Sequence, residues 1–338
     1  MSNKEYAKNS KKIDKDIIYV IIVIIFIISF IIKLPIIVSS TGGLTNLDSK
    51  IKIKNEYKNK GSFNMTYVSE LYPNIYAWLY AKISPYADIE KLEDYLMEND
   101  NEKDMDSRSK MDLEESFDVA TILGYQKSSS YVIINKEEII VSYILKDAKT
   151  DLQVGDQIIS INNEKVSSRE NLKNIIDKIE LNQKIEIEVI NNNKTYKRYA
   201  SKTIIEDLEL IGFSYNVDYD ITTKPEITIK KDSRESGPSG GLMLTLEIYN
   251  SLVKEDITKG YKIAGTGTIN LDGVVGPIGG IKYKLRGAVK NKAKIFFAPA
   301  GENYEEAIKE KEKNNYKIDI VSVETIDDAL EYLKKLEK

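Results

Sequence analysis

The sequence contains no histidine and no cysteine. Without histidine there is no Ser-His-Asp triad and no histidine-ligated zinc site, and without cysteine there is no thiol nucleophile, thiolate cluster or disulfide. The fold must therefore be stabilised by packing alone. A hydrolase built from this chain needs serine or threonine paired with lysine, or a pair of carboxylates.

Two further classes of protein are disfavoured by what the chain lacks. The formal net charge is -4, whereas a general nucleic-acid-binding protein normally presents a basic face. The G-x-x-x-x-G-K-[ST] motif is absent, so we expect no nucleotide site and no ATPase activity. We expect no cofactor and no metal. At 338 residues the chain is long enough for two domains and additional segments.

A long apolar block lies near the N-terminus. It runs without charge from Ile17 to Ile32 and, after Lys33, continues as LPIIV to Val38. A spanning helix needs about 20 apolar residues, so we predict a transmembrane anchor in the lipid bilayer over 17–38. The lysines of residues 1–16 are expected to keep that segment cytoplasmic and to place the later domains outside the cell. The alternatives are a cleaved signal peptide, disfavoured by the length and by the missing A-x-A-like site, and a buried core segment.

Residues 39–116 are predicted to form an extracellular connecting segment that packs on the C-terminal domain of residues 203–338. KIKIKNEY and SFNMTYVSEL alternate as two paired strands would, and residues 90–115 indicate a charged helix or linker. An aromatic cluster is interpreted as packing on the later domain or lying at the lipid interface. Its members are Tyr72, Tyr76, Trp78, Tyr80 and Tyr86.

Residues 117–202 are predicted to form a compact unit. Its piece L-x-V-G-D-x-I-x-x-I-N-x-x-x-V resembles a PDZ domain. Gly155 would provide unrestricted backbone angles at a turn, Asp156 local hydrogen bonds, and Asn171–Ile179 the amphipathic helix beside a peptide groove. The resemblance implies capture of extended peptides by strand addition. No G-L-G-F carboxylate loop is present, so recognition of a free C-terminus is not implied. The alternative interpretation is a spacer.

Residues 203–338 are predicted to form a domain of alternating strands and helices, which makes the fold class α+β. Within it, Ser239 lies in a Gly-Pro-Ser-Gly-Gly turn before an almost wholly apolar, and therefore buried, helix. Ser239 is a candidate nucleophile. Gly237, Pro238 and Gly240 would form its turn and the oxyanion region, where the helix N-terminus would face developing negative charge. The plainer interpretation of Ser239 is an ordinary helix N-cap.

The lysines of GGIKYK are the candidate bases. A buried lysine loses its proton near neutral pH because an apolar pocket penalises the charged form. On a helix that starts at Ile281, the position of the apolar stripe slightly favours Lys284 over Lys282. Either lysine taken alone is more simply a solvated surface charge.

The run ESGPSGGLMLTLEIYNSL, followed by AGTGTINLDGVVGPIGGIKYKLRGA, resembles the proteolytic domain of Lon, a Ser-Lys peptidase. The resemblance implies that Ser239 is the nucleophile, Lys284 the base, and Thr266 the hydroxyl that orients the lysine. Two positions depart from the pattern. Ser236 stands where Lon usually has an acidic residue, and Thr268 stands where Lon has glutamate, so the roles of those acids do not carry over.

The order of anchor, PDZ-like unit and Lon-type domain resembles the membrane-anchored PDZ–Lon-like serine peptidases of Gram-positive bacteria. The resemblance implies an ATP-independent serine endopeptidase at the cell membrane that cleaves exported peptides or proteins on the outer face. Two rival interpretations remain. C-terminal-processing peptidases also join a PDZ domain to a Ser-Lys pair, although their motifs differ from PIGGIKYK. A catalytically silent membrane adapter would use the PDZ-like unit alone.

Overall fold

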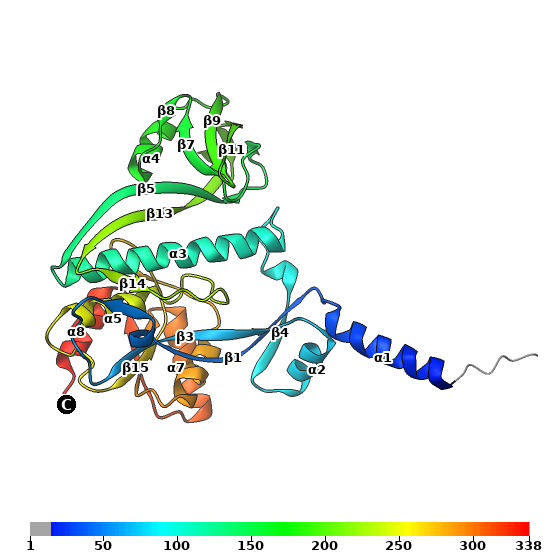
Figure 1. Ribbon diagram of the computed structural model, residues 1–338, viewed down its shortest axis with the longest axis vertical. Coiled ribbons are helices and arrows are strands. Elements are labelled where there is room, and N and C mark those ends of the chain that lie inside the picture. Colours follow the sequence, from blue (N-terminus) through cyan, green and yellow to red (C-terminus); the bar gives the residue numbers. More distant parts are fainter. Residues whose placement is uncertain (1–14, 338) are drawn as a thin grey trace, which may run out of the picture. The chain divides into compact units, whose positions relative to one another are not determined.

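The computed structural model describes residues 15–337 (Figure 1). This part of the chain separates into two compact units. The first runs up to Ser40 and resumes over Glu70–Tyr95, and the second comprises Thr41–Ser69 and the chain from Leu96 onward. Two strands, β1 (Ile36–Asn46) and β3 (Ser62–Leu71), carry the chain from one unit into the other.

The first unit is built from two helices and an antiparallel strand pair. The elements are α1 (Lys15–Ile31), the start of β1, α2 (Ile75–Ile83), β4 (Ala87–Lys91) and the 3-10 turn η2 (Leu92–Asp94). Phe30 at the end of α1 stacks on Tyr76 of α2, with ring centroids 4.2 Å apart. β1 pairs with β4 from Ile36 to Ser40. Tyr76 of the predicted aromatic cluster therefore packs against α1.

The apolar block predicted as one helix over 17–38 is divided in the structure. α1 ends at Ile31, and Ile36 begins β1, in which Val38 is fully buried. Pro35 lies between them and has no N–H with which to continue a helix. The prediction of a helix to Val38 is therefore wrong. No helix within residues 15–337 has the length and apolar character needed to cross a membrane.

The second unit is organised on a sheet in which β3, β15, β18 and β19 are successive parallel neighbours. β1 lies on the other side of β3, and the full strand order is β19-β18-β15-β3-β1-β4. Parallel strands need crossover connections, which the helices between them supply. The elements are β15 (Lys262–Gly265), α6 (Ile281–Lys290), β18 (Ile295–Pro299), α7 (Glu302–Asn314), β19 (Asp319–Val323) and α8 (Ile326–Lys335). Every residue of β18 is buried, as expected for a strand covered on both faces.

An inserted sheet interrupts this domain between two long strands. β5 (Tyr131–Ile144) and β13 (Phe213–Lys224) pair antiparallel along their whole length, and the sheet continues as β13-β5-β7-β9-β10-β6, with β8 on β7. Its other elements are β6 (Lys149–Thr150), β7 (Gln157–Ile161), β8 (Glu164–Lys165), α4 (Arg169–Asp177), β9 (Lys184–Asn191) and β10 (Lys194–Ser201). The helix predicted over Asn171–Ile179 is thus present as α4, two residues earlier.

The turn of the PDZ-like motif has the local geometry that its residues predict. Gly155 has a φ of +90°, and Asp156 is fully buried. One carboxylate oxygen of Asp156 accepts hydrogen bonds from the Gln153 amide at 2.8 Å and from Arg198 Nε at 2.9 Å. Asp156 therefore fixes the turn from within the sheet.

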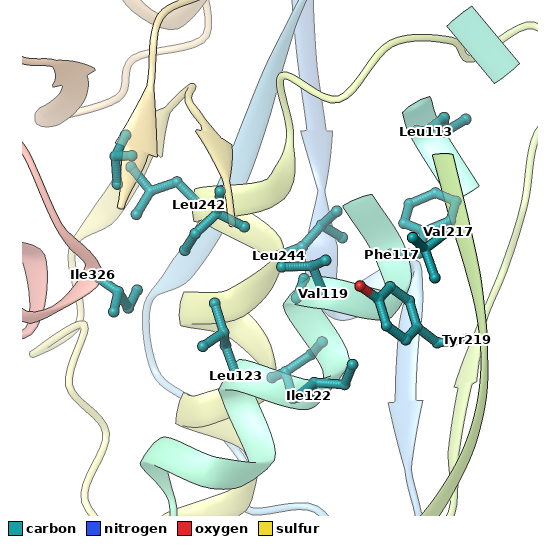
Figure 2. Close-up of a cluster of buried hydrophobic side chains, with 14 of the residues drawn as sticks. Leu113, Phe117, Val119, Ile122, Leu123, Val217, Tyr219, Leu242, Leu244 and Ile326 are labelled. Atoms are coloured by element: carbon teal, nitrogen blue, oxygen red, sulfur yellow. The ribbon is translucent and has the colours of Figure 1, made fainter. Parts of the chain in front are cut away.

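The predicted domain boundary between 116 and 117 falls inside helix α3 (Glu102–Lys127), which is continuous across it. Its C-terminal half is buried between two neighbours. Figure 2 shows Val119 against Leu244 of the helix α5 (Gly241–Leu252), and Val217 and Tyr219 of β13 on another side of α3. At Gly124 a Cβ would lie 2.5 Å from Ile248 Cγ2, so α3 and α5 approach each other closely.

Short strands complete the second unit. They are β2 (Ile51–Ile53) after the 3-10 turn η1 (Leu47–Ser49), β11 (Thr203–Ile205), β12 (Leu208–Leu210), β14 (Ile227–Ile229), β16 (Thr268–Ile269) and β17 (Val275–Gly276). β2 pairs with β14, whereas β3 pairs with β15. The predicted pairing of KIKIKNEY with SFNMTYVSEL is therefore wrong, although SFNMTYVSEL is a strand. The predicted domain boundary at 202 is also crossed, because β13 follows it in the sequence but pairs with β5, which precedes it.

Glu247 on α5 provides a test of how the core responds to pH. It is 1% exposed, and burial raises its pKa from 4.5 to about 7. Folding therefore takes up a proton between these values, and the free energy of unfolding falls as pH rises from about 4.5 to about 7. We expect Glu247→Gln to stabilise the fold at pH 8 by up to about 3 kcal/mol and to have little effect at pH 4. Urea unfolding at the two pH values measures this, with the exposed Glu306→Gln as control.

A Glu247→Gln protein that is no more stable than the wild type at pH 8 would contradict the expectation. The Glu306→Gln control should show no difference from wild type at either pH, since that side chain lies on the exposed face of α7.

Candidate active site

Ser239 lies in the turn that leads into α5. The turn uses Gly237 with a φ of +80°, a backbone conformation that favours glycine. The N-cap of α5 is Gly240, which has no side-chain capping bond. Ser239 therefore precedes the cap and does not act as the N-cap residue. Its side chain is partly exposed at the start of a buried helix.

Helix α3 holds this turn in place from the other side. The Gly237 amide donates to the Ser109 carbonyl at 2.7 Å, and Ser116 Oγ donates to the Pro238 carbonyl at 3.2 Å. At Gly241 a Cβ would lie 3.0 Å from Ser116 Oγ, so α3 approaches too closely for a larger residue. Sequence reasoning missed Ser109 and Ser116. They lie in a charged stretch that precedes the turn by more than 100 residues, and no local pattern marks them.

The two candidate lysines of α6 differ in their surroundings. Lys284 is 4% exposed, whereas Lys282 is only partly buried and its Nζ lies 4.9 Å from the ring centroid of Tyr283. The helix begins at Gly280, which has a φ of +68° and lies so close to Val68 that a Cβ would be 2.8 Å from Val68 Cγ2. This tight start fixes the rotation of α6 and turns Lys284, not Lys282, into the protein.

Thr266 connects Lys284 with the nucleophile turn. Lys284 Nζ donates to Thr266 Oγ1 at 3.2 Å, and Thr266 Oγ1 donates to the Ser239 carbonyl at 3.0 Å. The Gly267 amide donates to the same carbonyl at 2.9 Å. Thr266 is fully buried at the end of β15. The structure thus brings together the three residues to which the sequence analysis gave catalytic and orienting roles.

Burial dominates the electrostatics of Lys284. It lowers the pKa of the lysine from 10.5 to about 8, because the apolar surroundings penalise the ammonium. At neutral pH a small but useful fraction of the side chain is then the free amine. A neutral amine is a proton acceptor, and its nearest polar partner here is the hydroxyl that also contacts the Ser239 backbone. Through Thr266, Lys284 is thus linked to the backbone of Ser239.

The two positions that depart from the Lon pattern lie at the edge of this arrangement. Ser236 is exposed, and Thr268 begins β16, where it pairs with Gly276. A Cβ at Gly276 would lie 2.4 Å from Thr268 Oγ1, so the threonine lies directly over that glycine. Within residues 15–337 no cluster of three or more acidic side chains is placed to hold a metal ion.

A serine turn at a helix start and a buried lysine, joined through a threonine, form the arrangement that the sequence analysis expected of a serine–lysine proteolytic domain. Residues 148–335 match the family of the Lon protease (S16) C-terminal proteolytic domain. Because the match covers more than half of the 338-residue chain, the chain belongs to this family. The matched range also includes most of the inserted sheet, in which no PDZ domain is identified.

Individual relatives match over shorter stretches. The chain is 40% identical over 91 residues to a Lon protease of Mesomycoplasma hyopneumoniae, covering 26% of this chain and 10% of that protein. It is 34% identical over 122 residues to a Lon protease of Campylobacter jejuni, covering 35% and 14% of the two chains. A Lon protease of Geobacter metallireducens is 35% identical over 114 residues, covering 33% and 13%. The chain thus matches only a small part of the length of these relatives.

The role of Thr266 can be tested through the pKa of Lys284. Replacing Thr266 with Val removes the oxygen that accepts from the ammonium, so we expect the pKa of Lys284 to fall below about 8. Thr266→Ser keeps the oxygen and should leave the pKa unchanged. NMR titration of the Lys284 side chain, assigned with a Lys284→Met protein, measures both. Equal pKa values in the Val and Ser variants would contradict the role of this hydrogen bond.

Proposed function

We propose that the protein is an ATP-independent serine endopeptidase in which Ser239 is the nucleophile and Lys284 the general base. The observation that carries the proposal is the buried Lys284, whose pKa is lowered to about 8 and whose Nζ donates to Thr266 Oγ1. Membership of the Lon proteolytic family supports it. The sequence contains no phosphate-binding loop motif, which supports independence from ATP.

The proposed reaction needs no group beyond the chain itself and water. The free amine of Lys284 removes the proton of Ser239 Oγ, and the oxygen attacks the substrate carbonyl carbon. Backbone N–H groups of the turn around Ser239, among them that of Gly240, stabilise the oxyanion, whereas Pro238 has no N–H and the Gly237 N–H is bonded to Ser109. The Lys284 ammonium then returns the proton to the leaving amine as the peptide C–N bond breaks. Water, deprotonated by Lys284, hydrolyses the acyl-enzyme and restores Ser239.

Substitution of the two proposed catalytic residues tests this function. We expect Ser239→Ala and Lys284→Met each to lower the rate by several orders of magnitude, because the nucleophile and the base act as a unit. Lys282→Met is the matched control on the same helix and should keep most of the activity. The measurement is mass spectrometry of peptides released from an unfolded protein substrate by the full-length protein.

The outcomes of this comparison separate the alternatives. An active Lys284→Met protein with an inactive Lys282→Met protein would move the base to Lys282. Identical product pools from wild type and Ser239→Ala would favour the catalytically silent adapter. In the proposed function the inserted sheet assists capture of extended peptides, as its PDZ-like motif around Gly155 and Asp156 predicts.

We also propose that α1 attaches the protein to the cell membrane, with its C-terminal domains on the outer face, where it cleaves exported peptides or proteins. From Ile17 to Ile31 the helix carries no charge, and none of its residues is buried. So large an exposed apolar surface is unfavourable in water and favourable in lipid. The lysines within residues 1–16 support the cytoplasmic placement of the N-terminus.

Charges placed on α1 should release the protein from membranes. Ile21, Ile24 and Ile28 are each more than 40% exposed, so aspartate at these positions can act on membrane partition without disturbing the core. We expect the triple Asp variant to move from the membrane to the soluble fraction of lysed cells. The control replaces Ile204, Leu208 and Val274, which are also exposed. Wild-type protein in the soluble fraction would contradict the attachment.

A further inference from the structure

A cavity of about 200 Å³ lies beside the nucleophile turn and is not used by the proposed reaction. Pro238, which directly precedes Ser239, forms part of its wall, together with Ile269 of β16. The opposite wall comes from α3 and from β13 of the inserted sheet. A side chain of a peptide bound over Ser239 would therefore find this cavity next to the scissile bond.

Two carboxylates of α3 line the cavity. Asp112 and Glu115 lie on the same face of the helix, and both accept a hydrogen bond from Asn216 Nδ2, at 2.9 Å and 2.8 Å. The Asn216 amide is a neutral partner, so these two bonds supply no positive charge to the carboxyls. Burial raises the pKa of each carboxyl above its usual range, and this is opposed only in part by the Asn216 hydrogen bonds and by one guanidinium each, that of Arg108 for Asp112 and that of Arg169 for Glu115. The cavity is thus lined by more acidic than basic side chains.

The cavity also contains a hydroxyl that is not satisfied by the protein. Tyr219 of β13 is 4% exposed, and its Oη has no hydrogen-bond partner among the described residues. Figure 2 shows this oxygen directed toward Val119 of α3, which also lines the cavity. Buried polar groups are normally paired, so an unpaired hydroxyl beside two carboxylates indicates a place for a ligand that donates hydrogen bonds.

We propose that this cavity is a substrate subsite for a cationic side chain, lysine or arginine, of a residue that flanks the scissile bond. Asp112 and Glu115 provide the negative charge, and Tyr219 Oη accepts a hydrogen bond from the ammonium or guanidinium group. Val119 and Ile269 contact the methylene groups of the same side chain, as apolar residues do around the stems of lysine and arginine. This proposal rests on the peptidase function proposed above.

Other side chains fit this cavity less well. An apolar side chain would leave the Tyr219 hydroxyl without a partner and would offer nothing to the free lone pairs of the two carboxylates, which is unfavourable in a buried site. An acidic side chain would be repelled by Asp112 and Glu115. Arg169 also borders the cavity, but its side chain is exposed, and the lining keeps a net negative charge when Arg169 is counted.

Binding and cleavage together test the subsite. Two fluorescent peptide pools, random except for a central lysine or norleucine, are titrated onto the full-length Ser239→Ala protein. Norleucine matches the lysine side chain without its charge. We expect at least tenfold tighter binding of the lysine pool. Asp112→Asn combined with Glu115→Gln should abolish that preference, and Glu114→Gln, a control on the same helix outside the cavity, should keep it. Thermal unfolding checks that the variants fold.

A second variant isolates the hydroxyl. Tyr219→Phe keeps the ring and its packing but removes Oη, so the lysine preference should fall several-fold while binding of the norleucine pool stays unchanged. Equal binding of the two pools to the Ser239→Ala protein would overturn the subsite. An unchanged lysine preference in the Asp112→Asn, Glu115→Gln variant would do the same.

The proposed function is judged separately, by sequencing the cleavage sites that the wild-type protein produces. Cleavage that depends on Ser239 but shows no enrichment of lysine or arginine beside the cut would overturn the subsite and leave the peptidase in place. A lysine preference in binding without any Ser239-dependent cleavage would instead overturn the peptidase, and would support the cavity as a cation-binding site.

Discussion

The burial of one amine is the constraint on which the site depends. Lys284 reaches Thr266 only because α6 starts at the tight Gly280 turn, and Thr266 is available only because β15 ends there, with Gly265 paired beside Phe297 of β18. The surroundings that exclude water from the lysine are the same helix and strands that form the core of the domain. The reactivity of the amine is therefore a property of the packed domain and not of any single loop.

Helix α3 gives the site its second support. One side of it packs on α5 and bonds the turn of Gly237 and Pro238, and another side packs on β13. The nucleophile turn and the inserted sheet thus share one rigid neighbour. In the proposed subsite, a ligand near Asn216 of the inserted sheet would also contact α3, the helix that holds the turn of Ser239.

The local parts of this architecture could be predicted from the sequence. Continuous apolar runs mark β18 and β19, and the spacing of Ser239 and Lys284 follows a family pattern contained in one stretch of chain. Apart from the helix end at Pro35, which is a local signal, the failed predictions needed information about distant contacts. The strand Ser62–Leu71 was recognisable, but its pairing with β15 was not, since period-2 alternation carries no register. Ser116 and Tyr219 were missed because their importance lies in what packs against them.

The pairing of β3 with β15 has a consequence for how the protein is made. Asn64 and Thr66 of β3 bond the carbonyls of Ile263 and Gly265, in each case across 199 residues of chain. The inserted sheet lies between these strands and consists mainly of contacts within itself, so it can fold first. The parallel sheet on which α6, the helix of Lys284, packs is complete only after its last strands emerge from the ribosome. Long-range closure of this kind is slow. A nascent chain therefore completes α1 and the inserted sheet before Lys284 can be buried.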